Sequence, residues 1–122
     1  MKKIEFCLKA CLLSLLFIGC GYKNEPDLII VNNSGSDFIL AYTTTTYGVD
    51  SLYLKPLKNG KKAEMSLLIR DSIKADGCYL FHAEGSDGRV IDKCFGYYTN
   101  GASLNRGFKL MIEEDTVLIS SW

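Results

Sequence analysis

The chain has 122 residues with 14 basic and 14 acidic side chains, and 48% of its residues are hydrophobic. The chain has no net excess of basic residues, which argues against a nucleic-acid partner. If residues 1–19 are removed as a signal peptide, three lysines and one glutamate leave with them. The remaining 103 residues have a formal charge of −2. That length supports one hydrophobic core and is too short for two domains.

The first nineteen residues have the order of a secretory signal peptide. Lys2 and Lys3 precede an apolar run over 11–18, which ends at the small residue Gly19. The run is less than half of the ~20 apolar residues that a bilayer-spanning helix needs. We therefore expect residues 1–19 to direct export and then to be removed.

The segment Phe17-Ile18-Gly19-Cys20 resembles the lipobox of bacterial lipoproteins, although Phe17 departs from the usual leucine. The resemblance implies that Cys20 becomes the first residue and carries lipid, including palmitate. Since each buried CH₂ contributes about 0.8 kcal/mol, two or three acyl chains hold a protein on a membrane almost permanently. We expect a lipid-anchored cell-envelope protein in the outer membrane. It faces either the periplasm or the cell surface. In the alternative, an ordinary signal peptide is cleaved nearby and Cys20 carries no lipid.

The cysteine count agrees with export. Cys7 and Cys11 leave with the signal peptide and Cys20 takes lipid, so Cys78 and Cys94 remain as one disulfide pair. A three- or five-residue loop centred on Ser86 makes these two cysteines direct cross-strand neighbours, whereas a two- or four-residue loop puts them on opposite faces. We expect the first arrangement and the bond.

The remaining chain predicts a lipidated tether over 20–27 and one domain over 28–122. Short apolar stretches alternate with period two between turn signals, and no stretch shows a sustained helical period. This pattern predicts an all-β fold, an antiparallel two-sheet sandwich of immunoglobulin-like type, with a small β-barrel as the alternative. The expected strands are 27–32, 37–45, 51–56, 63–69, 78–84, 89–96, 107–113 and 116–121.

Two turns predict local hairpins. Asn59-Gly60 suits a type I′ turn, because both central positions of that turn need positive φ. The resulting register places Lys55 opposite Glu64, Tyr53 opposite Ser66, Leu54 opposite Met65 and Leu52 opposite Leu67. A turn at Glu114-Asp115 places Phe108, Leu110, Ile112, Val117 and Ile119 on one face.

No group of residues predicts catalysis, a metal site or a cofactor. His82 is the only histidine, and the favoured register puts it on the same face as Asp92, which allows a contact between them. No serine or cysteine nucleophile can be placed beside His82, so we expect no catalytic residue and no enzyme. The ligands that zinc needs are missing at motif spacing. The acids at 87 and 113–115 are expected to be solvated turns and not calcium ligands.

The longest predicted loop, over 97–107, is expected to be exposed and to be the binding site. Its composition is typical of adaptable recognition loops, in which tyrosine supplies rigid area and amides supply hydrogen bonds. The alternative is a plain crossover. A second candidate is a basic group that either meets anionic headgroups or glycans or keeps a hairpin tip soluble. The loop residues are Tyr97, Tyr98, Asn100, Asn105 and Arg106, and the basic group is Lys55, Lys58, Lys61 and Lys62.

Three tripeptides resemble the O-glycosylation acceptor of a Gram-negative phylum rich in lipoproteins, which is aspartate, then serine or threonine, then an apolar residue. The candidate acceptors are Ser51, Ser72 and Thr116. The alternative is that aspartate before an apolar strand produces the pattern by itself.

The chain after Cys20 resembles the small β-sandwich lipoproteins of that phylum, whose domains open with an Asn-rich turn like the one over 31–37. The resemblance carries over no functional residue. We expect a non-enzymatic binding or accessory module with an unknown protein or glycan partner. The alternative is an envelope inhibitor of a lysozyme-like hydrolase or a protease. The chain resembles such inhibitors only in its size and its expected location in the envelope.

Overall fold

The described part of the chain consists of strands, turns and loops. The computed structural model describes residues 25–46, 48, 51–67, 76–100 and 102–122, so the segment expected to be a signal peptide, Cys20 and Ser72 lie outside the described residues. The strands are β1 (Asp27–Asn32), β2 (Phe38–Thr45), β3 (Ser51–Tyr53), β4 (Lys62–Ser66), β5 (Gly77–Gly85), β6 (Val90–Thr99), β7 (Ala102–Ser103), β8 (Gly107–Ile112) and β9 (Val117–Ser121). Within those residues, no helix is long and apolar enough to cross a bilayer.

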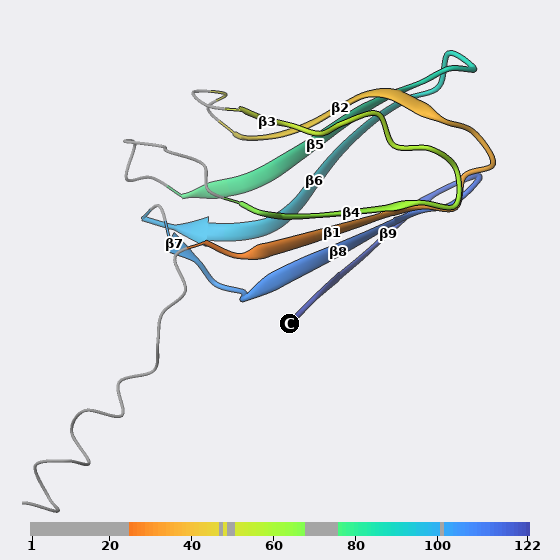
Figure 1. Cartoon of the computed structure of the whole chain (residues 1–122). Coiled ribbons are helices and arrows are strands. Elements are labelled where there is room, and N and C mark those ends of the chain that lie inside the picture. The colour runs from red at the N-terminus through yellow and green to blue at the C-terminus, as the bar shows by residue number, and fades with distance from the viewer. Residues whose placement is uncertain (1–24, 47, 49–50, 68–75, 101) are drawn as a thin grey trace, which may run out of the picture.

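The strands form two sheets that pack face to face (Figure 1). One sheet has the order β4-β1-β8-β9 and the other has the order β3-β2-β5-β6-β7. The expected all-β, two-sheet sandwich is therefore confirmed. Pairing is antiparallel except between β1 and β8, which run parallel from Asp27 opposite Gly107 to Asn32 opposite Ile112.

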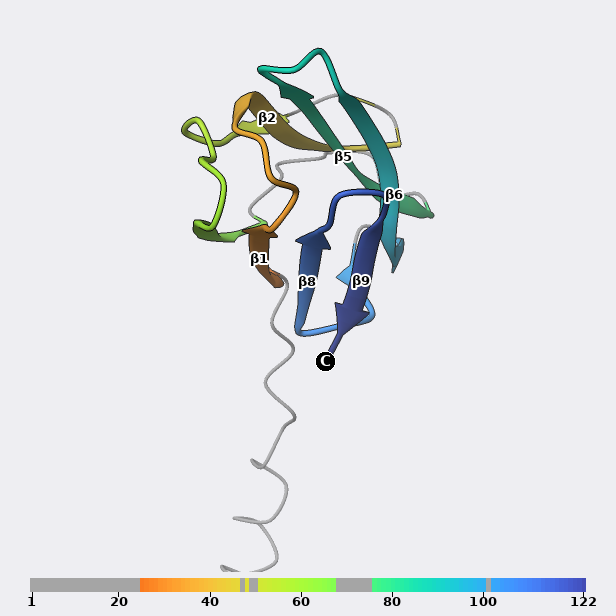
Figure 2. The same ribbon diagram turned by 90° about the vertical axis from the view of Figure 1, so that its right-hand side faces the viewer.

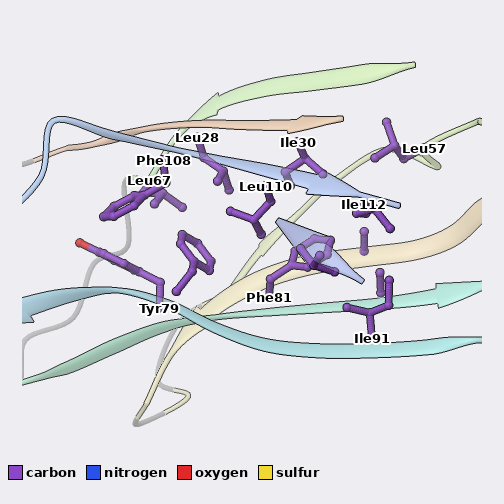
Figure 3. Close-up of a cluster of buried hydrophobic side chains, with 14 of the residues drawn as sticks. Leu28, Ile30, Leu57, Leu67, Tyr79, Phe81, Ile91, Phe108, Leu110 and Ile112 are labelled. Carbon is purple, nitrogen blue, oxygen red and sulfur yellow. The ribbon is translucent and has the colours of Figure 1, made fainter. Parts of the chain in front are cut away.

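Alternating apolar residues of both sheets fill the space between them (Figure 3). Leu28 and Ile30 on β1 are fully buried, and Phe81 on β5 faces them at 1% exposure. Aromatic rings cluster at one end, where Phe108 lies 5.4 Å from Phe95 and 5.7 Å from Tyr79, centroid to centroid. Burial of this apolar area is the main stabilising contribution to such a fold.

The hairpin of β8 and β9 has the predicted register. Ile112 lies opposite Val117 and Leu110 lies opposite Ile119, and the Glu113 N–H donates to the Thr116 carbonyl at 2.8 Å. Ile119 is nevertheless 42% exposed, because β9 is an edge strand and neighbours cover it on one side only. Local alternation and a short turn were sufficient to predict this unit.

The predicted loop centre at Ser86 is wrong by one residue. Gly85 donates to the Arg89 carbonyl, so the loop is Ser86-Asp87-Gly88 and is centred on Asp87. The Asp87 side chain accepts from the Arg89 N–H at 2.9 Å, and Gly88 adopts a φ of 86°, which glycine tolerates without strain.

The shifted loop moves the pairing by two residues and preserves the faces. Cys94 lies opposite Leu80, one diagonal step from Cys78. The two cysteines still form the expected disulfide across a Cα–Cα distance of 6.0 Å, because a shift of two residues leaves both on the same face. The bond ties β5 to β6 near the end of the sheet.

The predicted hairpin at Asn59-Gly60 is wrong. A turn is present, since the Lys61 N–H donates to the Lys58 carbonyl at 3.1 Å, but only Gly60 has positive φ, as in a type II and not a type I′ turn. The strands on either side then pair elsewhere. Tyr53 on β3 lies opposite Tyr42 of β2, and Met65 on β4 lies opposite Leu28 of β1.

The chain crosses between the two sheets over 54–61 for a physical reason. Pro56 has no N–H to continue a ladder, so β3 stops early. Leu57, at 3% exposure, exchanges two backbone hydrogen bonds of 2.9 Å with Phe38 and fills the core between the sheets. The predicted Lys55–Glu64 pair is therefore replaced by a Lys62–Glu64 ion pair at 2.9 Å.

Candidate functional site

Four side chains form a row across the outer face of the five-stranded sheet. Pairing places Tyr53 (β3) opposite Tyr42 (β2), Tyr42 opposite His82 (β5), and His82 opposite Asp92 (β6). Their neighbours along the strands, including Ala41, Phe81 and Ala83, are buried in the core. Because side chains alternate between faces of a strand, the row points away from the core.

The rings of the row are in contact. The Tyr42 centroid lies 5.2 Å from that of Tyr53 and 5.0 Å from that of His82, in tilted arrangements. Such spacings lie in the favourable range for aromatic pairs. Tyr53 is 67% exposed and gives the row an open ring face. Large exposed aromatic surface of this kind is typical of binding sites.

Each ring nitrogen of His82 lies within hydrogen-bond distance of a carboxylate. Nδ1 lies 2.7 Å from Oδ1 of Asp92, and Nε2 lies 3.1 Å from Oε1 of Glu84. The His82–Asp92 contact that the predicted register allowed is thus present, although the register differs. The hydrogen bond to Asp92 raises the pKa of His82, partial burial opposes this, and Glu84 adds to the rise. The arrangement favours imidazolium and leaves neither ring nitrogen free to act as a base.

A groove of about 530 Å³ opens beside Tyr53, between the chain after β3 and the edge strand β4. Leu54, Ala63 and Met65 line it with apolar surface that packs against the core. Four exposed lysines also line it, namely Lys55, Lys58, Lys61 and Lys62. Since Tyr53 lines the groove and also begins the row, the two form one continuous surface.

The buried side chain of Asn32 holds the lysine-bearing turn in place. Its Nδ2 donates to the carbonyls of Leu57 at 3.0 Å and Ser36 at 2.8 Å. Its backbone carbonyl accepts from Gly60 at 2.7 Å, and its N–H donates to the Lys61 carbonyl at 2.9 Å. Lys58 and Lys61 therefore stand on a preorganised turn and not on a free loop.

The charge of this groove is largely uncompensated. Lys62 pairs with Glu64, but in the part of the chain that the structure describes no ion pair involves Lys55, Lys58 or Lys61. Both members of the Lys62–Glu64 pair are more than half exposed, so solvent screens it. The groove is thus positive with an apolar floor, a combination that suits an anionic ligand with apolar surface.

The predicted binding segment is only partly exposed. β6 continues to Thr99 and is followed by β7, so a hairpin replaces most of the expected loop. The expected exposure of Tyr98 is wrong: it is 2% exposed, because its ring packs on Tyr79 at a centroid distance of 5.3 Å. Asn105 is half-buried and donates its N–H to Ser103 Oγ. The exposed members are Tyr97, Asn100 and Arg106.

The candidate acceptors for glycosylation differ in accessibility. Ser51 is half-buried at the start of the edge strand β3, and Thr116 is exposed in the β8–β9 turn. No group of three histidine, cysteine or acidic residues among the described positions is arranged to hold a metal ion.

Sequence reasoning missed the aromatic row. Tyr42, Tyr53 and His82 each fall on a predicted strand, and alternation could have assigned each to the outer face. Their contact depends on which strands pair, and the predicted partner of β3 was β4 in place of β2. Only the assembled sheet brings the three rings together.

No protein-family model matches the chain, and no curated protein sequence matches it either. A protein from Eubacterium rectale, solved by NMR, has a similar fold with a TM-score of 0.57 and 11% sequence identity. The match covers 84% of this chain and 93% of that protein. At this identity the likeness shows the fold alone.

Proposed function

We propose that the protein is a non-enzymatic binding module, exported and held on the envelope membrane by lipid on Cys20, and that it binds an acidic glycan. One observation carries the glycan-binding part of the proposal. Tyr53, at 67% exposure, stands between the aromatic row and the lysine-lined groove. A ligand that contacts Tyr53 can therefore reach rings on one side and cations on the other.

The chemistry of this surface matches that of a sugar chain with acidic groups. The apolar face of a sugar ring packs on a tyrosine ring, whose hydroxyl remains available for a hydrogen bond. Exposed Asp92 and Glu84 accept hydrogen bonds from hydroxyl groups, and lysines attract carboxylate or phosphate groups. Because the floor and the turn are preorganised, little ordering cost opposes binding.

Binding of the purified domain to a panel of neutral and uronate-containing oligosaccharides tests the proposal. We expect binding of acidic members and loss of at least tenfold in affinity in Tyr53→Ala. Lys55→Ala should lower the affinity for acidic ligands and leave the affinity for any neutral ligand unchanged. Leu118→Ala is the matched control, since Leu118 is 55% exposed but lies on β9 of the other sheet. A wild-type domain that binds no glycan, or that binds unchanged in Tyr53→Ala, would contradict the proposal.

The membrane anchor has its own test. The lipobox-like Phe17-Ile18-Gly19-Cys20 predicts that Cys20→Ala yields an unlipidated, poorly processed precursor. Mass spectrometry of the native protein should find acyl chains on an N-terminal cysteine. An unmodified N-terminus at another residue would contradict lipid anchoring without bearing on the glycan surface.

A further inference from the structure

Three segments meet at the end of the sandwich where β1 begins. The Asp27 N–H donates to the Arg106 carbonyl at 2.9 Å, and the Arg106 N–H donates to the Trp122 carbonyl at 2.8 Å. Figure 2 shows the start of β1 and the C-terminus at the same, lower end of the domain. The segment before β8 and the end of the chain are therefore neighbours of the N-terminal strand.

Large apolar side chains are exposed at this end. Leu104 is 59% exposed, Trp122 is 50% exposed and Tyr97 is 46% exposed. Tyr97 lies near Leu104 along the backbone, since its carbonyl accepts from the Leu104 N–H at 3.3 Å, but its ring faces outward from the five-stranded sheet, because the adjacent Tyr98 is buried. A monomeric soluble domain rarely gathers such residues without a partner for them.

The tryptophan ring is held in a defined position. Its atoms lie so close over Gly107 that a Cβ at that residue would collide with them. One part of the ring thus packs on the backbone of β8, while the remainder faces outward. The exposed ring is part of the folded surface and not a free C-terminal side chain.

The distance along the chain to Cys20 suggests what covers this surface. Asp27 lies seven positions after Cys20, and a chain of that length spans at most about 25 Å. The lysine-bearing turn lies at the far end of β1, beside Asn32, about 17–20 Å from Asp27. Because the chain to Cys20 leaves the domain at Asp27, next to Arg106 and Trp122, lipid on Cys20 would bring this end of the domain nearest to the bilayer.

We propose that Leu104 and Trp122 form a bilayer contact that seats this end of the domain in the interfacial region of the membrane. Tryptophan and tyrosine concentrate at membrane interfaces, where an apolar ring body and a polar tip are both satisfied. The exposed Arg106 lies among them and can bind a lipid phosphate through two parallel hydrogen bonds. The location rests on the proposed lipid anchor, whereas the affinity of these side chains for lipid does not.

The charges at this end define the lipid that it fits. The acidic residues Glu25 and Asp27 lie at the start of β1, whose backbone contacts Arg106, so this end offers no cluster of basic residues to anionic headgroups. The contact is therefore apolar and interfacial, and phosphatidylcholine is sufficient for it. The arrangement turns the lysine-lined groove away from the bilayer, toward a ligand in solution.

Trp122 is the only tryptophan of the chain, so its fluorescence reports on the contact directly. The native protein is reconstituted into phosphatidylcholine vesicles with or without lipids brominated on their acyl chains. We expect bromolipids to quench Trp122 by at least half, and we expect its emission to lie at shorter wavelength than in the purified, lipid-free domain without vesicles.

Two variants provide a matched comparison. Leu104→Ser should reduce the quenching at least twofold, whereas Leu118→Ser should leave it unchanged, because Leu118 has similar exposure but lies toward the opposite end of the domain. Protein that is bound to vesicles and is not quenched overturns the bilayer contact and leaves the anchor in place. Protein that is neither bound nor quenched overturns both.

Discussion

His82 and Asp92 lie directly opposite each other on β5 and β6, with 2.7 Å between Nδ1 and the nearer carboxylate oxygen. The histidine side chain is 18% exposed and that of Asp92 is 76% exposed. The contact therefore joins a half-buried imidazole to a solvated carboxylate. Its main consequence is a raised pKa of His82, opposed in part by burial of the ring.

This raised pKa predicts that stability depends on pH. A pKa that is higher in the folded state means that folding favours imidazolium. The stabilisation is fully present below the unfolded value of about 6.5 and is lost as the pH rises through the folded pKa. The difference in Tm between wild type and His82→Gln should therefore be larger at about pH 5.5 than at about pH 8.5.

Salt provides a control for that experiment. Because Asp92 is largely solvated, about 0.5 M sodium chloride should reduce the difference measured at the lower pH. An equal difference in Tm at both pH values would show that His82 contributes through packing on Tyr42 and not through its charge.

The Cys78–Cys94 disulfide should contribute measurably to stability. Closing a loop of this size stabilises a small domain by about 3 kcal/mol, mainly through the unfolded state. Denaturant titration with and without reductant should give that difference for the wild type and none for a Cys78→Ser/Cys94→Ser double variant. Thiol labelling of the non-reduced protein should find neither cysteine free, and labelling of both would contradict the bond.

Tyr97 and Tyr98 are predicted to respond in opposite ways to alanine substitution. Tyr98→Ala should cost about 3–5 kcal/mol of unfolding free energy, because its ring is almost fully buried against Tyr79. Tyr97→Ala should change it by less than about 0.5 kcal/mol, as expected of an exposed residue. Chemical denaturation checks both values.

The hydroxyl of Tyr98 allows a sharper version of this test. It is buried, and among the described residues it has no hydrogen-bond partner. Because an unsatisfied buried hydroxyl carries a desolvation cost, Tyr98→Phe should be neutral or stabilising. A loss above about 1 kcal/mol would indicate a partner for the hydroxyl in solution.

Asn32 should be more important for stability than its surface neighbour Asn33. Its amide donates two hydrogen bonds, and its Oδ1 accepts from the backbone and hydroxyl of Ser34 at 3.1 and 2.6 Å. Removing these bonds in Asn32→Ala leaves buried groups unpaired and should cost at least about 2 kcal/mol. The exposed Asn33→Ala should cost less than about 0.5 kcal/mol. Equal effects of both variants in thermal denaturation would contradict this role.

The amino-acid sequence by itself determined the local elements of this domain. Period-two alternation predicted eight of the nine strands near their observed positions and the inward residues of β8, and a two-residue turn was sufficient for the β8–β9 register. The disulfide was also predictable, because a loop with an odd number of residues puts Cys78 and Cys94 on one face, and a shift of two residues in the pairing does not change this. These features depend on residues close in the chain, where turn chemistry and side-chain alternation act directly.

Only the tertiary structure decided which strands pair across the sandwich. Side-chain alternation predicts which face of β3 is apolar, but it does not distinguish β2 from β4 as the strand that pairs with β3. Pro56 ends the local ladder and burial of Leu57 between the sheets favours the crossover, so β3 joins β2 and β4 joins β1. The contact of Tyr53 with Tyr42 follows from that choice, and the burial of Tyr98 follows from the packing of its ring on Tyr79. They depend on the total apolar area that the assembled core removes from water, which no single segment specifies.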